Sequence, residues 1–294
     1  MMRMPQKRPE IGSRMRSIIS VLREYPLLSL GIMVLSLMVV GAIFAPWITP
    51  YPGDSGIATN VSQALLSPNS QHWFGTDQIG RDIFTRTIYG ARISLSIAAF
   101  VILTSACIGL TLGLVAGFFG GWLDSLIMRI TDVFLAFPAL LLAVSLTAVL
   151  SPSATNAALA LALTWWPWYA RLSRGEATTI RKAGFADAAR VIGAGKVRIL
   201  TRHVFPNAAS AVFVQMSLDG AGIILTASTL SYLGLGAQDP TAEWGLMVSQ
   251  GQSLATTAWW VVAFPGMAIL LTAVAFNFLG DGLQNILDPK RRSQ

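Results

Sequence analysis

Five stretches of the chain contain no Asp, Glu, Lys or Arg, and each of them holds a long apolar run. A helix that crosses a membrane needs about 20 predominantly apolar residues. Only 12% of all residues are charged, whereas about 25% are charged in a soluble domain. The sequence therefore predicts a membrane protein. The charge-free stretches are 25–53, 93–123, 133–170, 220–238 and 244–280.

The stretch 133–170 is 38 residues long, which is too long for a single membrane helix. Its Ser151-Pro152-Ser153 sequence is typical of a turn, so we expect two helices there and six in all. Helices satisfy their backbone hydrogen bonds internally, and the alternating strands of a membrane β-barrel are not seen in the sequence. The predicted fold class is thus all-α with six transmembrane helices, at 27–49, 93–117, 127–150, 155–172, 210–233 and 257–280.

The distribution of basic residues predicts the orientation in the membrane, because cytoplasmic segments carry an excess of Lys and Arg. The tail 1–26 contains six of them, the region 171–202 contains eight and the tail 283–294 contains three. The loop 234–256 contains none. We therefore expect both termini in the cytoplasm and the segment 50–92 in the periplasm.

The longest predicted cytoplasmic loop, 175–207, contains a short amphipathic pattern. Phe185, Ala188, Ala189 and Ile192 recur at spacings of three and four residues, which place them on one face of a helix. A helix with small alanines beside one aromatic side chain fits a groove on another protein. The loop is therefore a candidate contact for a partner.

This loop resembles the coupling loop of ABC-importer permeases. Asp187-Ala188-Ala189 is followed by three residues, Gly193, nine residues and His203-Val-Phe-Pro206. The family pattern has Glu at the position of Asp187 and Ile at that of His203. Three further stretches resemble the dipeptide, oligopeptide and nickel branch of the family, in particular its C-type permease subunit. They begin with His72-Trp-Phe-Gly, Leu233-Gly-Leu-Gly and Phe276-Asn-Phe-Leu.

The resemblance implies a type I importer transmembrane core at 93–282, which forms half of a solute pathway. It implies three kinds of partner: a second homologous permease, one or two ABC ATPases, and a periplasmic or lipid-anchored solute-binding protein. ATP and Mg²⁺ would bind to the ATPases, and this chain would bind no cofactor. The implied solute is a di- or oligopeptide, with nickel or a metal chelate as the alternative.

The resemblance also implies which side chains contact an ATPase. The alternative is that the same short helix only fixes two membrane spans together. The residues expected to take part in coupling are Phe185, Asp187, Ala188, Ala189, Arg190, Gly193, His203 and Pro206.

Several chemistries need residues that this chain lacks. A phosphate loop requires Gly at 190 and Ser or Thr at 197, where the sequence has Arg190 and Val197. The two histidines, His72 and His203, are predicted on opposite sides of the membrane and cannot form a zinc-protease motif. Cys107 is the only cysteine, so we expect no disulfide and no metal site. A membrane-embedded enzyme is the alternative of another class, and nucleic-acid binding is not expected because the basic residues lie beside apolar spans.

Glycines at 109, 113 and 117 recur every four residues along the second predicted span. This spacing places Gly109, Gly113 and Gly117 on one helix face, where another helix can approach closely. The sequence leaves open whether that helix belongs to this chain or to a partner permease.

Charged residues within a membrane are costly unless they are paired or wetted. Arg129 and Asp132 are three residues apart and are expected to pair with each other. Asp219 has no basic neighbour in the sequence, so it either faces the solute pathway, where it would meet an amino group or a cation, or caps a partner's helix. The polar segment 72–92 either docks the solute-binding protein or pairs its own charges to hold the first two spans together.

Overall fold

The computed structural model of the chain describes residues 23–182 and 195–287. These residues form helices joined by connections of unequal length, with one isolated β-bridge between Thr76 and Asp82. The longer helices are α2 (Pro26–Ile48), α3 (Ile83–Phe119), α4 (Gly121–Leu135), α5 (Ala139–Leu150), α6 (Ala154–Arg181), α9 (Phe205–Tyr232), α10 (Trp244–Gly251) and α11 (Trp260–Leu287). The short elements are η1 (Pro52–Ser55), η2 (Val61–Gln63), α8 (Lys196–Ile199), η3 (Leu200–Val204) and η4 (Gln252–Leu254).

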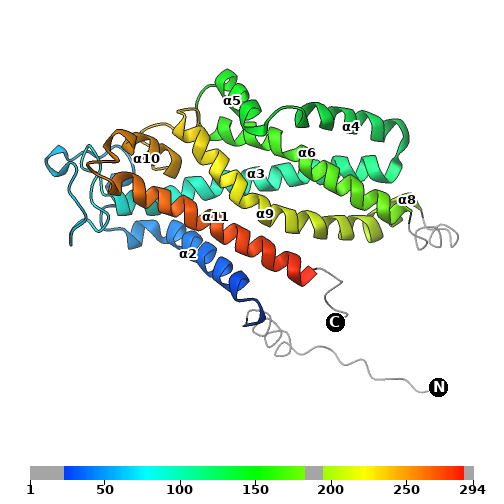
Figure 1. Ribbon diagram of the computed structural model, residues 1–294, viewed down its shortest axis with the longest axis horizontal. Helices are drawn as coiled ribbons and strands as arrows, with labels where there is room; N and C mark the ends of the chain where they lie inside the picture. Colours follow the sequence, from blue (N-terminus) through cyan, green and yellow to red (C-terminus); the bar gives the residue numbers. More distant parts are fainter. Residues whose placement is uncertain (1–22, 183–194, 288–294) are drawn as a thin grey trace, which may run out of the picture.

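Most of the long helices run side by side along the longest axis of the molecule (Figure 1). The central helix α3 packs against α6 and α9, and α2 packs against α11. Helix α10 and the connections 49–82 and 233–259 lie at one end of the molecule, which we call the α10 end (Figure 1). The chain that flanks residues 183–194 lies at the opposite end, which we call the α8 end.

The core between these helices is built largely from small side chains. Its main cluster includes Ala98 of α3, Ala158 and Leu161 of α6, and Ile223 and Ile224 of α9. Lipid is as apolar as leucine, so helices in a membrane associate through close packing of small residues rather than through the hydrophobic effect. The alanine-rich core is suited to that environment.

Among the described residues, four helices are long and apolar enough to cross a membrane, namely α2, α3, the continuous helix Lys196–Tyr232 and α11. Helices α4 and α5 together make a fifth candidate, bent by 86°. Helix α6 is not among them, because its apolar first half is followed by Trp, Pro, Tyr and Arg residues. The prediction of an all-helical membrane protein is confirmed at this coarser level.

Several of the predicted helices differ from the observed ones in extent. The fourth, predicted over 155–172, runs on to Arg181, and the last, predicted over 257–280, runs on to Leu287. The second begins ten residues earlier than its predicted start at 93, at Ile83. Asp82 caps this helix by accepting a hydrogen bond from the Thr85 backbone amide, a polar signal that a hydropathy pattern does not contain. The prediction of one continuous helix over 127–150 is wrong. The helix ends at Leu135 and restarts after Pro138, because proline disfavours helical backbone at the residue before it.

Helix α9 begins at Phe205, not at 210, and continues from a π-helical turn, η3. The Phe205 amide donates a hydrogen bond to the Leu200 carbonyl, five residues earlier. Pro206 cannot donate, and in a regular helix its ring would meet the carbonyl four residues before it. The wider turn accommodates this proline and lets the helix run without a break from 196 to 232.

Candidate functional site

The segments that flank residues 183–194 pack into one apolar cluster at the α8 end. Ile180 lies in the last turn of α6, Ile199 lies in α8 and Val204 lies in η3, and each has an exposed fraction of 9% or less. The other buried members of the cluster are Leu114, Phe118, Ala177 and Ala208. Closely packed interiors transmit displacement because they do not deform easily. A force applied to residues 183–194 would therefore reach α3, α6 and α9 together.

Six of the predicted coupling residues lie outside the described residues: Phe185, Asp187, Ala188, Ala189, Arg190 and Gly193. The other two are described, His203 half-buried in η3 and Pro206 exposed near the start of α9. Beside them the side chains of Val197 and Phe205 are 71% and 47% exposed. The α8 end thus presents apolar side chains next to the predicted contact helix.

The glycine face of α3 packs against α6 of the same chain. A Cβ atom added at Gly117 would lie 2.5 Å from the Arg174 carbonyl oxygen, and one added at Gly109 or Gly113 would clash with α6 in the same way. Tyr169, opposite Gly109, is fully buried. The question that the sequence left open is answered in favour of an intrachain contact.

Two ion pairs join α4 to the second half of α6. The Arg174 guanidinium donates two hydrogen bonds to the Asp124 carboxylate, each 2.7 Å long. The Arg171 Nη2 atom donates to Asp132 Oδ1 at 2.7 Å. The expected pairing of Asp132 with Arg129 is therefore wrong, because Arg171 on the neighbouring helix reaches this carboxylate instead.

These arginines were counted in the sequence only as signs of a cytoplasmic segment, so their structural role was missed. A signal for it does exist. Arg171 and Arg174 are three residues apart on α6, and Asp124 and Asp132 are eight apart on α4, so each pair shares one helix face. Two acidic groups on one helix face and two basic groups on another indicate a contact between the helices.

Asp219 lies half-buried on α9. The Gln215 side-chain amide donates a hydrogen bond to its Oδ1 atom at 2.9 Å. Its Oδ2 atom has no hydrogen-bond partner among the described residues, although the Tyr169 hydroxyl of α6 lies near this carboxylate. Gln215, Asp219, Gly222 and Thr226 are all partly exposed. Their spacings of four, three and four residues place them on one face of α9, where Gln215, Asp219 and Thr226 form a polar stripe with Gly222 between them.

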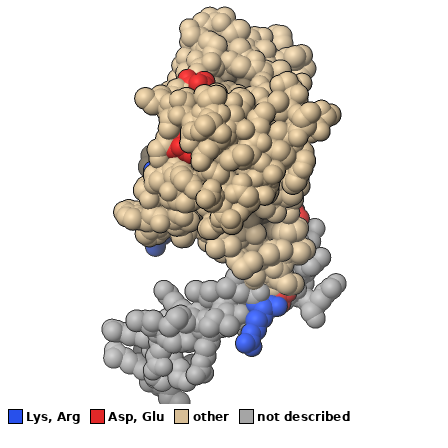
Figure 2. Space-filling model, turned by 90° about the vertical axis from the view of Figure 1, so that its left-hand side faces the viewer, with Lys and Arg blue, Asp and Glu red and all other residues tan. Residues whose placement is uncertain are grey.

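The α10 end has a network of buried charges, and few Lys, Arg, Asp or Glu side chains appear on its surface (Figure 2). Arg81 donates a hydrogen bond to Asp77 at 2.7 Å and more weakly to Asp239 at 3.5 Å. The His72 ring and Asp82, both buried, are joined by a 2.9 Å hydrogen bond. Of the two alternatives for the segment 72–92, this geometry matches a charge-paired structure.

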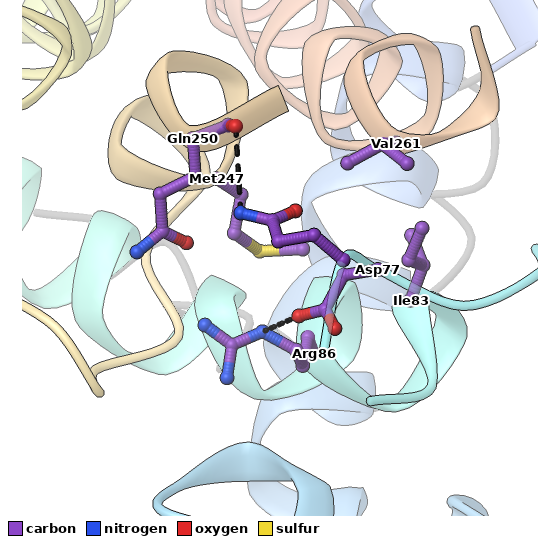
Figure 3. A pocket seen from close by; sticks show the side chains of 7 residues that line it. Asp77, Ile83, Arg86, Met247, Gln250 and Val261 are labelled. Atoms are coloured by element: carbon purple, nitrogen blue, oxygen red, sulfur yellow. Dashed lines mark hydrogen bonds and ion pairs between the residues drawn. The ribbon is translucent and has the colours of Figure 1, made fainter. Parts of the chain in front are cut away.

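Figure 3 shows the part of this network that reaches α10 and α11. Arg86 Nε lies 3.9 Å from Asp77 Oδ2. The Gln78 side-chain amide donates to the Gln250 backbone carbonyl at 3.4 Å. The small cavity between them is lined by Asp77, Gln78, Ile83, Arg86, Met247, Gln250 and Val261. The connection before α3 is thereby bound to α10 and lies against the start of α11.

Glu243 caps the start of α10 from a fully buried position. Its carboxylate accepts hydrogen bonds from the Gly245 and Leu246 amides at 3.1 and 2.9 Å and from the Ser94 hydroxyl at 3.0 Å. Burial raises the pKa of Glu243, although the hydrogen bonds from the backbone act in the opposite direction. Trp244 beside it donates from Nε1 to the Thr87 carbonyl at 2.8 Å. These contacts connect α10 to α3.

The sequence matches known membrane components over most of its length. Residues 109–293 match the family described as binding-protein-dependent transport system inner membrane component. Residues 13–68 match the N-terminal transmembrane domain of oligopeptide transport permease C.

Relatives from several bacteria align with nearly the whole chain. A dipeptide transport system permease protein of Alkalihalophilus pseudofirmus is 42% identical over 98% of this chain and 94% of its own length. A probable D,D-dipeptide transport system permease protein of Escherichia coli is 41% identical over 97% and 94%. A glutathione transport system permease protein of Escherichia coli is 44% identical over 91% and 88%.

Proposed function

Since this chain belongs to the family of binding-protein-dependent transport system inner membrane components, we propose that it forms half of a transmembrane pathway for di- or oligopeptides. It is an inner-membrane permease subunit of an ABC importer and not an enzyme. The family implies partner ATPases and a solute-binding protein. Dipeptide and glutathione stand in the names of the three relatives above, which supports a peptide solute, and nickel stands in none of the three.

The proposed assembly has a second homologous permease, which supplies the other half of the pathway, and one or two ATPases, which hold ATP and Mg²⁺. The ATPases dock at the α8 end and the solute-binding protein at the α10 end. Six spans follow when the bent α4–α5 pair and α6 are counted with the four long apolar helices. Both termini then lie in the cytoplasm, which labelling of cysteines introduced at 292 and at 55 from one side of sealed vesicles would test.

The observation that carries the coupling role is the apolar cluster of Ile180, Ile199 and Val204. It connects both flanks of residues 183–194 to α3. The sequence of that segment resembles a coupling helix, and its flanks are packed so that displacement of the segment acts on the adjoining ends of α3, α6 and α9 together. This arrangement supports ATP-driven alternating access. A channel that works without partner subunits would have no evident use for the segment.

The experiment replaces Asp187 by Ala in the complete importer. We expect ATP-dependent uptake of a labelled dipeptide, alanylalanine, to fall to near background, because the ATPases no longer engage the permease correctly. Glu176→Ala removes an acidic side chain from the same end, outside the motif, and is the matched control. Wild-type uptake by the Asp187→Ala complex would refute the coupling role.

The polar stripe on α9 supports a place for Asp219 in the pathway. In a membrane helix, a partly exposed carboxylate faces water, a partner or a solute. Asp219→Asn keeps the shape and the hydrogen bond from Gln215 but removes the charge. We expect slower dipeptide uptake at unchanged expression, and unchanged uptake would remove Asp219 from the mechanism.

A further inference from the structure

We propose that the Asp124–Arg174 and Asp132–Arg171 pairs make α4 follow α6 whenever the ATPases displace residues 183–194. Arg171 and Arg174 would thus be positioning residues for the coupling of ATP hydrolysis to transport. The proposal rests on the coupling role described above, because it assumes that this segment is what moves. It concerns the next step, the transfer of that movement to α4.

Helix α4 contacts α3, from which only Gly120 separates it, and α6, but little of α4 is buried. Thr131 is its only buried residue, and Trp122, Leu126 and Val133 are 72%, 50% and 61% exposed. Large apolar side chains that face lipid do not draw helices together. The position of α4 along α6 must therefore be fixed by specific contacts between the two helices.

Those contacts form an antiparallel ladder. From the start of α4 the rungs are Asp124 with Arg174, then Asp132 with Arg171, and finally Phe134 with Trp166, whose rings meet edge to face at 5.5 Å. Figure 1 shows α4 beside α6 toward the α8 end. Both ion pairs thus lie on the half of α6 that leads directly into residues 183–194, and the Phe134–Trp166 contact lies next to Pro167.

Helix α5 is held to α6 in a different way. Ala143 and Thr147 are fully buried, and Ala143 belongs to the main core cluster together with Ala157 and Ala158 of α6. The 86° bend separates α5 from α4, so the packing of α5 does not fix the direction of α4. Only α4 depends on the ion pairs.

Helix α6 itself is divided between these two contacts. Pro167 lies inside it and cannot donate the hydrogen bond that would reach the carbonyl four residues earlier, so the helix is weakest there. The half before Pro167 packs on α5, and the half after it carries both arginines. Movement of residues 183–194 can therefore tilt the second half, and the ladder makes α4 tilt with it.

The two ion pairs are unequal. In the Asp124–Arg174 pair the side chains are 22% and 41% exposed, and in the Asp132–Arg171 pair they are 61% and 52% exposed. A bidentate, partly buried pair is stronger and more directional than an exposed single contact. The first pair is consequently the one to perturb.

The test uses the full importer in proteoliposomes and compares wild type with Asp124→Arg, Arg174→Asp and the double exchange. ATP hydrolysis and uptake of labelled alanylalanine are measured in the same vesicles. We expect each single variant to lower the uptake per ATP hydrolysed at least about fivefold, the lower end of coupling between distant sites, and the exchange to restore it. Arg129→Asp, on the same helix but outside the ladder, is the matched control and should resemble wild type.

A merely structural role would predict loss of thermal stability without loss of coupling in the complexes that remain folded. The proposal is overturned if folded single variants keep the wild-type ratio of uptake to hydrolysis, or if the exchange recovers assembly but not that ratio. Arg174→Lys keeps the charge without the two parallel hydrogen bonds. It gives a folded variant in which a partial loss of coupling is expected.

A second measurement does not depend on the solute. Spin labels on Ser125→Cys in α4 and Thr179→Cys in α6, in a Cys107→Ser background, report the separation of the two helices. We expect the same distance in resting and ATP-trapped wild type and a broadened distribution in the trapped Arg174→Asp complex. If the distance in the wild type changes between the two states, α4 does not follow α6 and the proposal is refuted. If the wild type takes up no alanylalanine, only the proposed solute is refuted.

Discussion

Gly113 at the contact of α3 with α6 gives the sharpest test of the helix packing. In Gly113→Ala the new methyl group would lie 2.7 Å from the Ser173 Cβ atom and 2.9 Å from the Arg174 backbone nitrogen. Its closest neighbour is the Ala170 carbonyl oxygen. Backbone atoms cannot swing away as a side chain can, so the two helices must separate.

The expected cost follows from two opposing effects. Overpacking a well-packed contact costs about 1–3 kcal/mol, and alanine is a better helix former than glycine by roughly 0.8–1.0 kcal/mol. The difference leaves the variant less stable by up to about 2 kcal/mol. At about 2–4 °C per kcal/mol for a chain of this size, the Tm of the purified permease complex should fall by several degrees.

Gly41→Ala is the matched control, because nothing lies within 4 Å of a Cβ atom added at Gly41 of α2. There only the helix propensity changes, so the Tm should stay the same or rise slightly. Thermal unfolding of both variants in the same detergent separates the two effects. If Gly113→Ala is as stable as Gly41→Ala, the close approach of α3 to α6 does not exist in the protein.

The α10 end supports two further predictions. Arg81→Met should lower the stability by about 3–5 kcal/mol, because it leaves the buried Asp77 carboxylate without its closest ion-pair partner; a Tm within a degree of wild type would contradict this. Because burial raises the pKa of Glu243 above its ordinary value of 4.5, the folded protein holds this proton more tightly than the unfolded one, and stability should fall as pH rises from about 4.5. Glu243→Gln should therefore make the Tm depend less on pH above about 4.5. If the slope of Tm against pH is unchanged in this variant, the dependence comes from other groups.

Hydropathy and charge were enough to predict the long helices, because a span must be apolar and about 20 residues long wherever it occurs. They did not predict the break before Pro138, since it falls inside a charge-free run. The start of α3 at Ile83 was also missed, because the first turns of this helix are buried by protein at the α10 end, so a run of charges there does not end the helix.

The candidate site was predictable in part. The spacing of Gly109, Gly113 and Gly117 indicated a packing face, but only the fold shows that α6 covers it. Arg171 and Arg174 could be read as cytoplasmic charges without reference to their partners, because the positive-inside rule concerns position and not contact. The six central coupling residues fall on 183–194, outside the described residues, and their role stays a prediction.

The contact between Arg81 and Asp239 joins residues 158 positions apart. In the proposed orientation both lie outside the cytoplasm, and the segment that contains Arg81 is synthesised well before Asp239. Until the connection 233–259 is in place, the connection 49–82 exposes charged groups that are buried in the finished protein. The α10 end can therefore form only late in biogenesis. It forms only if the helix pairs on both sides of these two connections have been inserted correctly.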